Sequence, residues 1–110
     1  MKNAEVIEVL SNLVKCKSIT PNDDNCQTYI GGYLKQLGFN IYLKKYGDVS
    51  NIIAKKGSSG PVIAFVGHTD VVPTGDINQW SANPFELTEL KGKLYGRGTS
   101  DMKGSVACMM

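Results

Sequence analysis

Apolar residues at helical spacing predict two helices in the first third of the chain. Residues 4–15 place five aliphatic side chains on one face. A second apolar face follows Asp24 and runs to Gly38, where a glycine is typical of a helix end. Asp24, three residues before Gln27, is expected to cap this helix as in a capping box. Each apolar face must be covered by another part of the protein.

The middle of the chain changes to strand patterns. Residues 39–43 alternate apolar and polar side chains, and residues 49–54 predict a second strand after a short turn. Residues 62–66 are apolar without interruption. Such a run is typical of a central strand that is covered on both faces.

The last third of the chain predicts a loop, a hairpin and the start of a helix. Residues 73–84 contain two prolines and a glycine and predict a loop. Residues 85–90 and 93–95 are expected to pair around Lys91-Gly92, and a buried helix is expected from Gly104. Helices that alternate with strands predict the α/β class, with a mixed sheet flanked by helices.

Composition and charge narrow the class of protein. The 110 residues carry a net charge of +2 and no basic tract, which argues against a nucleic-acid partner. No apolar run approaches the roughly 20 residues of a membrane span, so no membrane partner is expected. The three cysteines (Cys16, Cys26 and Cys108) are odd in number and fit no metal-knot spacing. Free thiols in a reducing, cytoplasmic compartment are therefore expected.

The first candidate for chemistry is G-H-T-D at residues 67–70, directly after the apolar run. Ligands bind beyond the carboxyl ends of strands in α/β sheets. His68 and Asp70 lie two residues apart and point to the same side of an extended backbone. A histidine can bind a metal through one ring nitrogen while a carboxylate holds the other ring N–H. A hydrogen-bonded structural histidine remains the alternative on this motif alone.

The second candidate is Asp101, where the glycine-rich stretch at residues 96–104 enters the last helix. A dinucleotide-binding loop would need a small residue at this position, because a carboxylate would repel the pyrophosphate, and a P-loop would need G-K-[ST]. A carboxylate is suited to a cation, and the flanking glycines give the backbone the freedom to aim it. A helix N-cap is the alternative role for Asp101.

The two motifs together point to a known family. The sequences G-H-T-D-V-V-P-T-G-D and L-Y-G-R-G-T-S-D-M-K-G-S resemble the M20 family of zinc-dependent peptidases and deacylases. Within it, S-I-T-P-N-D-D-N-C-Q at residues 18–27 resembles the members that hydrolyse N-succinyl-L,L-diaminopimelate to succinate and L,L-diaminopimelate, a step in lysine and diaminopimelate biosynthesis. The resemblance runs over essentially all 110 residues and implies that residues 1–110 form the N-terminal part of a zinc-peptidase-like catalytic domain.

The resemblance implies roles for three residues. His68 would bind one zinc ion, Asp101 would bridge two, and cobalt would be possible at the second metal position. Asp70 would be the catalytic residue beside His68, and the peptide bond between Asp101 and Met102 would be cis. Two such ions would lower the pKa of a bound water and polarise the amide carbonyl of a small-molecule substrate.

The resemblance also implies that part of the site lies beyond Met110. In the family a general-base glutamate, further metal ligands and a lid domain that forms the homodimer all follow this position. The apolar residues 107–110 likewise predict a sequence that continues, because chain ends are usually polar. A catalytic zinc usually has three protein ligands. The 110 residues alone are therefore expected to bind zinc weakly and to hydrolyse nothing.

Two alternative functions remain open. Another M20 deacylase, such as acetylornithine deacetylase, would share the metal-binding motifs, and a non-catalytic α/β fragment is the alternative from another class. Arg97 is expected to anchor a loop or form a salt bridge rather than bind substrate. Trp80 and Phe85 are expected to pack the loop that follows the first motif.

Overall fold

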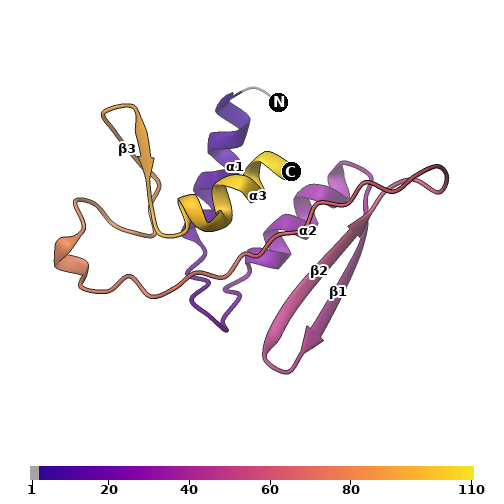
Figure 1. Ribbon diagram of the computed structural model, residues 1–110, viewed down its shortest axis with the longest axis horizontal. Helices are drawn as coiled ribbons and strands as arrows, with labels where there is room; N and C mark the ends of the chain where they lie inside the picture. Colours follow the sequence, from indigo (N-terminus) through magenta and orange to yellow (C-terminus); the bar gives the residue numbers. More distant parts are fainter. Residues whose placement is uncertain (1–2) are drawn as a thin grey trace.

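Two helices form where the apolar spacing predicts them. The computed structural model describes residues 3–110, with α1 over Asn3–Lys15 and α2 over Cys26–Gln36 (Figure 1). Both helices are therefore confirmed. α1 buries one aliphatic stripe and leaves its opposite face exposed, as the 3.6-residue period requires.

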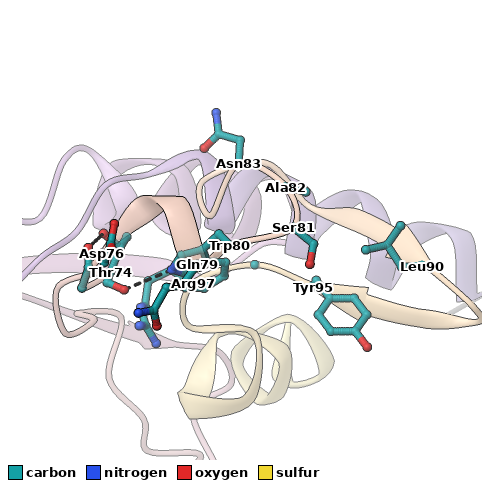
Figure 2. Close-up of a pocket in the computed structure, with 12 residues that line it drawn as sticks. Thr74, Asp76, Gln79, Trp80, Ser81, Ala82, Asn83, Leu90, Tyr95 and Arg97 are labelled. Atoms are coloured by element: carbon teal, nitrogen blue, oxygen red, sulfur yellow. Dashed lines mark hydrogen bonds between the residues drawn. The ribbon is translucent and has the colours of Figure 1, made fainter.

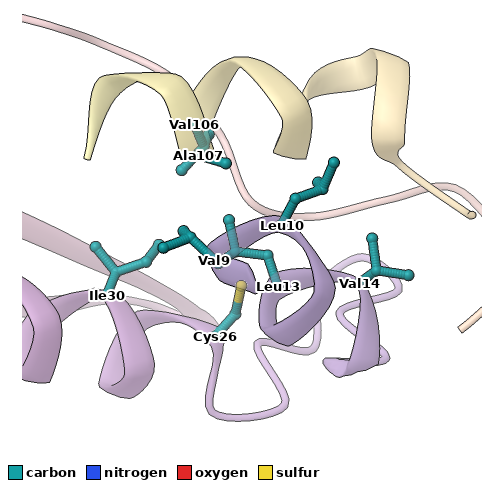
Figure 3. Close-up of a cluster of buried hydrophobic side chains, with 8 residues drawn as sticks. All are labelled: Val9, Leu10, Leu13, Val14, Cys26, Ile30, Val106 and Ala107. Carbon is teal, nitrogen blue, oxygen red and sulfur yellow. The ribbon is translucent and has the colours of Figure 1, made fainter. Parts of the chain in front are cut away.

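The core lies where α1 meets α2 and the C-terminal helix α3 (Gly104–Met109). Figure 3 shows these side chains converging between the three helices. The predicted burial of the last helix is confirmed, since its side chains Val106 and Ala107 are buried against α1. The cluster consists of Val9, Leu10, Leu13, Val14, Cys26, Ile30, Val106 and Ala107.

The predicted cap of α2 by Asp24 does not form, and the N-cap residue is Asn25, whose side chain makes no cap bond. The carboxylate of Asp23, not Asp24, accepts a hydrogen bond from the Gln27 backbone N–H at 3.2 Å. Asp24 and Asn25 both have positive φ, so the backbone turns sharply before α2. That turn directs Asp24 back toward α1, where its carboxylate accepts a bond from the Lys17 N–H at 2.6 Å.

A two-stranded hairpin follows α2. β1 (Asn40–Tyr46) and β2 (Val49–Lys55) pair antiparallel and extend slightly beyond the predicted strands. A Cβ on Gly31 of α2 would lie 3.1 Å from the Ile52 side chain and 3.3 Å from that of Ile41. Glycine therefore lets the hairpin approach the helix closely, which offsets the cost of a glycine within a helix.

The predicted central strand at residues 62–66 does not form. The segment has no regular structure, and Val62, Ile63 and Val66 are each 85% exposed. A central strand needs hydrogen-bonded neighbours on both edges. Within the described residues the only pairing nearby is a parallel bridge between Ile19 and Val71. The apolar pattern is thus that of a buried strand, but no strand among residues 3–110 lies beside it.

The remaining elements are short. β3 (Thr88–Leu90) and β4 (Lys93–Tyr95) form the predicted hairpin, although its first strand is shorter than expected. The predicted loop contains one 3₁₀ turn, η1 (Ile77–Gln79). After β4, a further helical turn, η2 (Thr99–Lys103), leads into α3. The strands of residues 3–110 thus pair as two separate sheets. No helix in this part of the chain has the length and apolar character needed to cross a membrane.

Candidate functional site

The His68 ring lies between two aspartates. Its Nε2 atom is 3.0 Å from Oδ1 of Asp101, which is 33 residues further along the chain. Its Nδ1 atom is 3.2 Å from Oδ1 of Asp70 and 3.1 Å from the Asp70 carbonyl oxygen. The structure therefore brings together the three residues that the sequence singles out.

Both ring nitrogens of His68 face acceptor oxygens, which has an electrostatic consequence. Partial burial by itself lowers the pKa of His68. The hydrogen bonds to the Asp70 carbonyl and the Asp101 carboxylate, together with the negative charges of both aspartates, raise the pKa by a larger amount. The net result is a pKa above the ordinary value for histidine. Only the doubly protonated ring can donate to both sides. A metal ion at Nε2 would take the place of the proton that faces Asp101.

The loop that follows α1 holds the segment that carries His68. The Ser18 hydroxyl, fully buried, donates to the Thr69 carbonyl at 2.7 Å. The Val71 N–H donates to the Ser18 carbonyl at 2.9 Å, and the Thr20 N–H donates to the Val71 carbonyl at 3.1 Å. These bonds fix residues 69–71 although no strand forms there.

Two side chains from the same region reach the site itself. The Thr20 hydroxyl donates to Oδ2 of Asp70. The Gln27 amide, largely buried in α2, donates to the Thr69 hydroxyl at 2.9 Å. From the sequence, Thr20 and Gln27 serve only as family markers, and their contacts with the site are not predicted. The available signal was a cluster of small polar residues directly after an apolar helix.

The turn that carries Asp101 depends on two glycines. Gly98 has φ 85° and is buried against the Val71 side chain, so a Cβ at this position would collide with Val71. A Cβ on Gly96 would lie 2.9 Å from the Val14 side chain, so the glycine lets the backbone at residue 96 approach α1 closely. The Lys103 N–H closes the turn on the Gly98 carbonyl at 2.8 Å.

Asp101 is not a helix cap. The residue before α3 is Lys103, and no side chain caps that helix. The Asp101 carboxylate is instead 86% exposed and faces His68. The N-cap alternative is therefore wrong, and the predicted cis bond between Asp101 and Met102 is confirmed.

Met102 connects the segment that carries His68 with the turn that carries Asp101. Its sulfur accepts from the His68 N–H at 3.4 Å. A Cβ on Gly67 would lie 3.0 Å from the Met102 methyl group, so any larger residue would make the methionine side chain shift. The two motifs thus touch through backbone and side chain as well as through the His68–Asp101 pair.

Arg97 anchors the loop after the first motif, as expected. Its guanidinium lies 5.2 Å from the centre of the Trp80 ring, and Nη2 donates to the Pro73 carbonyl at 3.2 Å. Trp80 in turn donates from Nε1 to the Thr74 carbonyl at 3.0 Å (Figure 2). These groups line a cleft of about 420 Å³ that does not include the His68 cluster. Their contacts support loop packing rather than chemistry.

His68 and Asp101 are a fitting but partial donor set for zinc. An imidazole nitrogen and a carboxylate oxygen are common zinc ligands, and two ligands of a tetrahedral zinc lie about 3.3 Å apart. The observed 3.0 Å separation is close to that value. Asp70 faces the other ring nitrogen, and among residues 3–110 no group of three or more histidine, cysteine, aspartate or glutamate side chains is arranged to hold one metal ion.

Comparison with known proteins identifies the relatives of this chain. Residues 64–110 match the model of the peptidase family M20/M25/M40. The chain is 50% identical over 108 residues to a Hydrogenovibrio crunogenus protein named succinyl-diaminopimelate desuccinylase, and 48% identical over 106 residues to one of that name from Legionella pneumophila. These matches cover 97% and 96% of this chain but only 29% and 28% of the two relatives, so it spans less than a third of their length.

Two solved structures share the fold. Human carnosine dipeptidase 1 matches with a TM-score of 0.78 and 28% identity, over 94% of this chain and 26% of that one. An M20 family metallo-carboxypeptidase from Sulfolobus solfataricus matches with a TM-score of 0.82 and 24% identity, over 97% and 25% of the two chains. The predicted α/β class is therefore confirmed, with small sheets and flanking helices.

The pKa of His68 gives a first prediction. In metal-free protein the imidazole should titrate above 6.5, followed by NMR of its ring proton. Asp101→Asn should lower that pKa because it removes one negative charge, whereas Asp48→Asn, an exposed change far along the sequence, should leave it unchanged.

The sign for stability follows from the same shift. A folded-state pKa above the unfolded one adds stability that is fully present below about pH 6.5 and is lost as the pH rises through the folded pKa. The side chain is 47% exposed, so this contribution is small. A His68 pKa at or below 6.5, or one insensitive to Asp101→Asn, would contradict the proposed pairing.

Proposed function

We propose that this chain, a relative of the M20/M25/M40 peptidases, supplies part of a metal centre that hydrolyses an amide bond. The observation that carries the proposal is the contact between His68 Nε2 and Asp101 Oδ1 at 3.0 Å. Both groups come from separate motifs, and both stay accessible to an ion and a substrate. An imidazole nitrogen and a carboxylate oxygen are both common zinc ligands, so this exposed pair can hold a metal ion in place of the shared proton.

Each residue of the cluster has a distinct task in this proposal. His68 and Asp101 would hold a zinc ion, and Asp101 would offer its second oxygen to another ion. Asp70 would hold the Nδ1 proton of His68, which leaves the lone pair on Nε2 and raises the basicity of the ligand. The catalytic contribution of Asp70 is thus expected to act through the His68 ring. Thr20 would orient the Asp70 carboxylate by its hydrogen bond.

The bound metal would act as a Lewis acid toward the amide carbonyl and the attacking water. A catalytic zinc usually takes three protein ligands, and residues 3–110 bring only His68 and Asp101 together. We therefore propose that the remaining ligands, and the general base, lie in sequence outside these residues. The relatives are more than three times as long as the matched region, which leaves room for such a contribution.

The substrate we propose is N-succinyl-L,L-diaminopimelate, with succinate and L,L-diaminopimelate as products. Relatives at 48–50% identity bear the name of that activity. The segment that resembles them most narrowly, residues 18–27, contacts the site through Ser18, Thr20 and Gln27. The segment that resembles these relatives therefore lies beside the proposed metal site rather than on a remote surface. Homodimerisation and a cytoplasmic location would accompany this function.

A related deacylase is the second candidate. Acetylornithine deacetylase would use the same metal donors, and human carnosine dipeptidase 1 shares the fold. The acyl group that is released discriminates between these activities, because succinate carries a second carboxylate that acetate lacks.

Zinc-loaded protein, expressed from the complete reading frame in which this sequence lies, should release succinate from N-succinyl-L,L-diaminopimelate far faster than acetate from N-acetylornithine. His68→Ala and Asp101→Asn should each lower kcat/KM by at least about 100-fold, since losing a ligand costs no less than losing a ligand's supporting group. Succinate release by a coupled assay is the measurement.

Asp48→Asn is the matched control, because it makes the same chemical change at an exposed position in the turn between β1 and β2. It should leave kcat/KM unchanged. Faster acetate release would favour the second candidate, and wild-type rates in both His68→Ala and Asp101→Asn would exclude a metal centre at these residues.

The 110 residues alone should bind zinc weakly and show no turnover. Two donors, both exposed to competing water, give less affinity than the three or more of a complete site. Calorimetric titration with zinc is the direct measurement. Tight binding of two ions by this polypeptide, or measurable succinate release, would contradict the proposal that the site is completed elsewhere.

A further inference from the structure

Lys103 is an unusual residue for the position it occupies. Its side chain is fully buried beside the core of α1 and α3. A lysine ammonium is seldom buried without a partner, because it loses its hydration. Nothing in the His68 cluster uses this side chain directly, so its burial requires another explanation.

The buried ammonium is bound by the C-terminal end of α1. Its Nζ atom donates to the Leu13 carbonyl at 2.7 Å and to the Cys16 carbonyl at 2.8 Å. Carbonyls at this end of a helix lack partners within the helix and carry the negative end of its dipole. A cation at this point satisfies both, so the helix end compensates for the lost hydration.

Lys103 lies two residues after Asp101, in the turn that presents that carboxylate. Three consecutive side chains then leave this turn in three directions: Asp101 contacts the His68 ring, Met102 contacts the His68 N–H, and Lys103 contacts α1. The first two contacts lie at the exposed site. Met102 also packs against the hydrophobic core, but of these three side chains only Lys103 is hydrogen-bonded to the end of α1.

The other half of the site is held by the same part of α1. Ser18 and Thr20, directly after the helix, bind residues 69–71. We infer that Lys103 is a positioning residue. Its ammonium fixes the Asp101 turn to the end of α1, so that the turn with Asp101 and the segment after His68 are held by the same part of the molecule. This inference deepens the proposed metal centre and rests on it for its function, but not for its structural content.

The first test measures the turn itself. Lys103→Met keeps the length and most of the volume of the side chain and removes the ammonium. Amide hydrogen exchange at residues 99–103 should be at least about tenfold faster in this variant, because the turn loses its tie to α1. Exchange in α2 should be unchanged. Wild-type protection of the turn would overturn the inference, whatever the protein does with metals.

The second test measures cobalt(II) binding by its visible absorption in the protein expressed from the complete reading frame. Lys103→Met should weaken binding by about 10–100-fold, the usual loss when a supporting group of a ligand is removed. Val106→Ala, a change in the same core that leaves the Lys103 bonds in place, should lower the melting temperature without that loss of affinity. Equal affinity in Lys103→Met and wild type would overturn the inference.

Lys103→Gln guards against a variant that does not fold. Its neutral amide can donate to a carbonyl, so its cobalt affinity should lie between those of wild type and Lys103→Met. If neither Lys103 variant folds while Val106→Ala does, Lys103 serves the whole fold rather than the turn, and the inference is overturned. If wild type and His68→Ala bind cobalt equally, the proposed metal centre fails, while hydrogen exchange still decides the role of Lys103.

Discussion

The contacts at the C-terminal end of α1 are the constraint on which the site depends. Helix ends leave carbonyl groups without a full set of partners. Here a buried lysine ammonium from the other end of the chain binds the Cys16 carbonyl and the Leu13 carbonyl, which also accepts from the Cys16 N–H. A few residues further on, Ser18 and Thr20 bind the segment that contains Asp70. Residues 13–20 thus bind both the segment after His68 and the turn after Asp101, although His68 and Asp101 are more than 30 residues apart in sequence. Together with the contact between Met102 and the His68 N–H, this stretch sets the position of His68 relative to Asp101.

This arrangement explains how a site can form where little regular structure exists. Residues 61–70 form no helix or strand, and Val62–Val66 are largely exposed. The site nevertheless has defined distances, because residues 67–71 are bound on one side by the loop after α1 and on the other by Met102. The glycines at 67 and 98 make these approaches possible, since a Cβ at either position would meet Met102 or Val71. Order at the site comes from polar bonds and close contacts rather than from a completed sheet.

The sequence predicts local features of this chain better than its long-range ones. The helical spacing of Leu10, Leu13 and Val14 places α1 correctly, because a periodic apolar face is decided by the segment itself. The run at 62–66 fails as a strand prediction, because a strand depends on neighbours that its own sequence does not specify. Asp24 fails as a cap because positive φ at Asp24 and Asn25 turns the carboxylate away from α2. His68, Asp70 and Asp101 could be found from their motifs, whereas the roles of Thr20 and Lys103 exist only in three dimensions.

We propose that His68 and Asp101 are donors to one metal ion. The most direct measurement is zinc anomalous diffraction from crystals of the protein expressed from the complete reading frame and grown with zinc. We predict an anomalous peak within bonding distance of both His68 Nε2 and a carboxylate oxygen of Asp101, at about 2.0–2.2 Å from each. Zinc bound to other residues, with the His68–Asp101 hydrogen bond still in place, would contradict it.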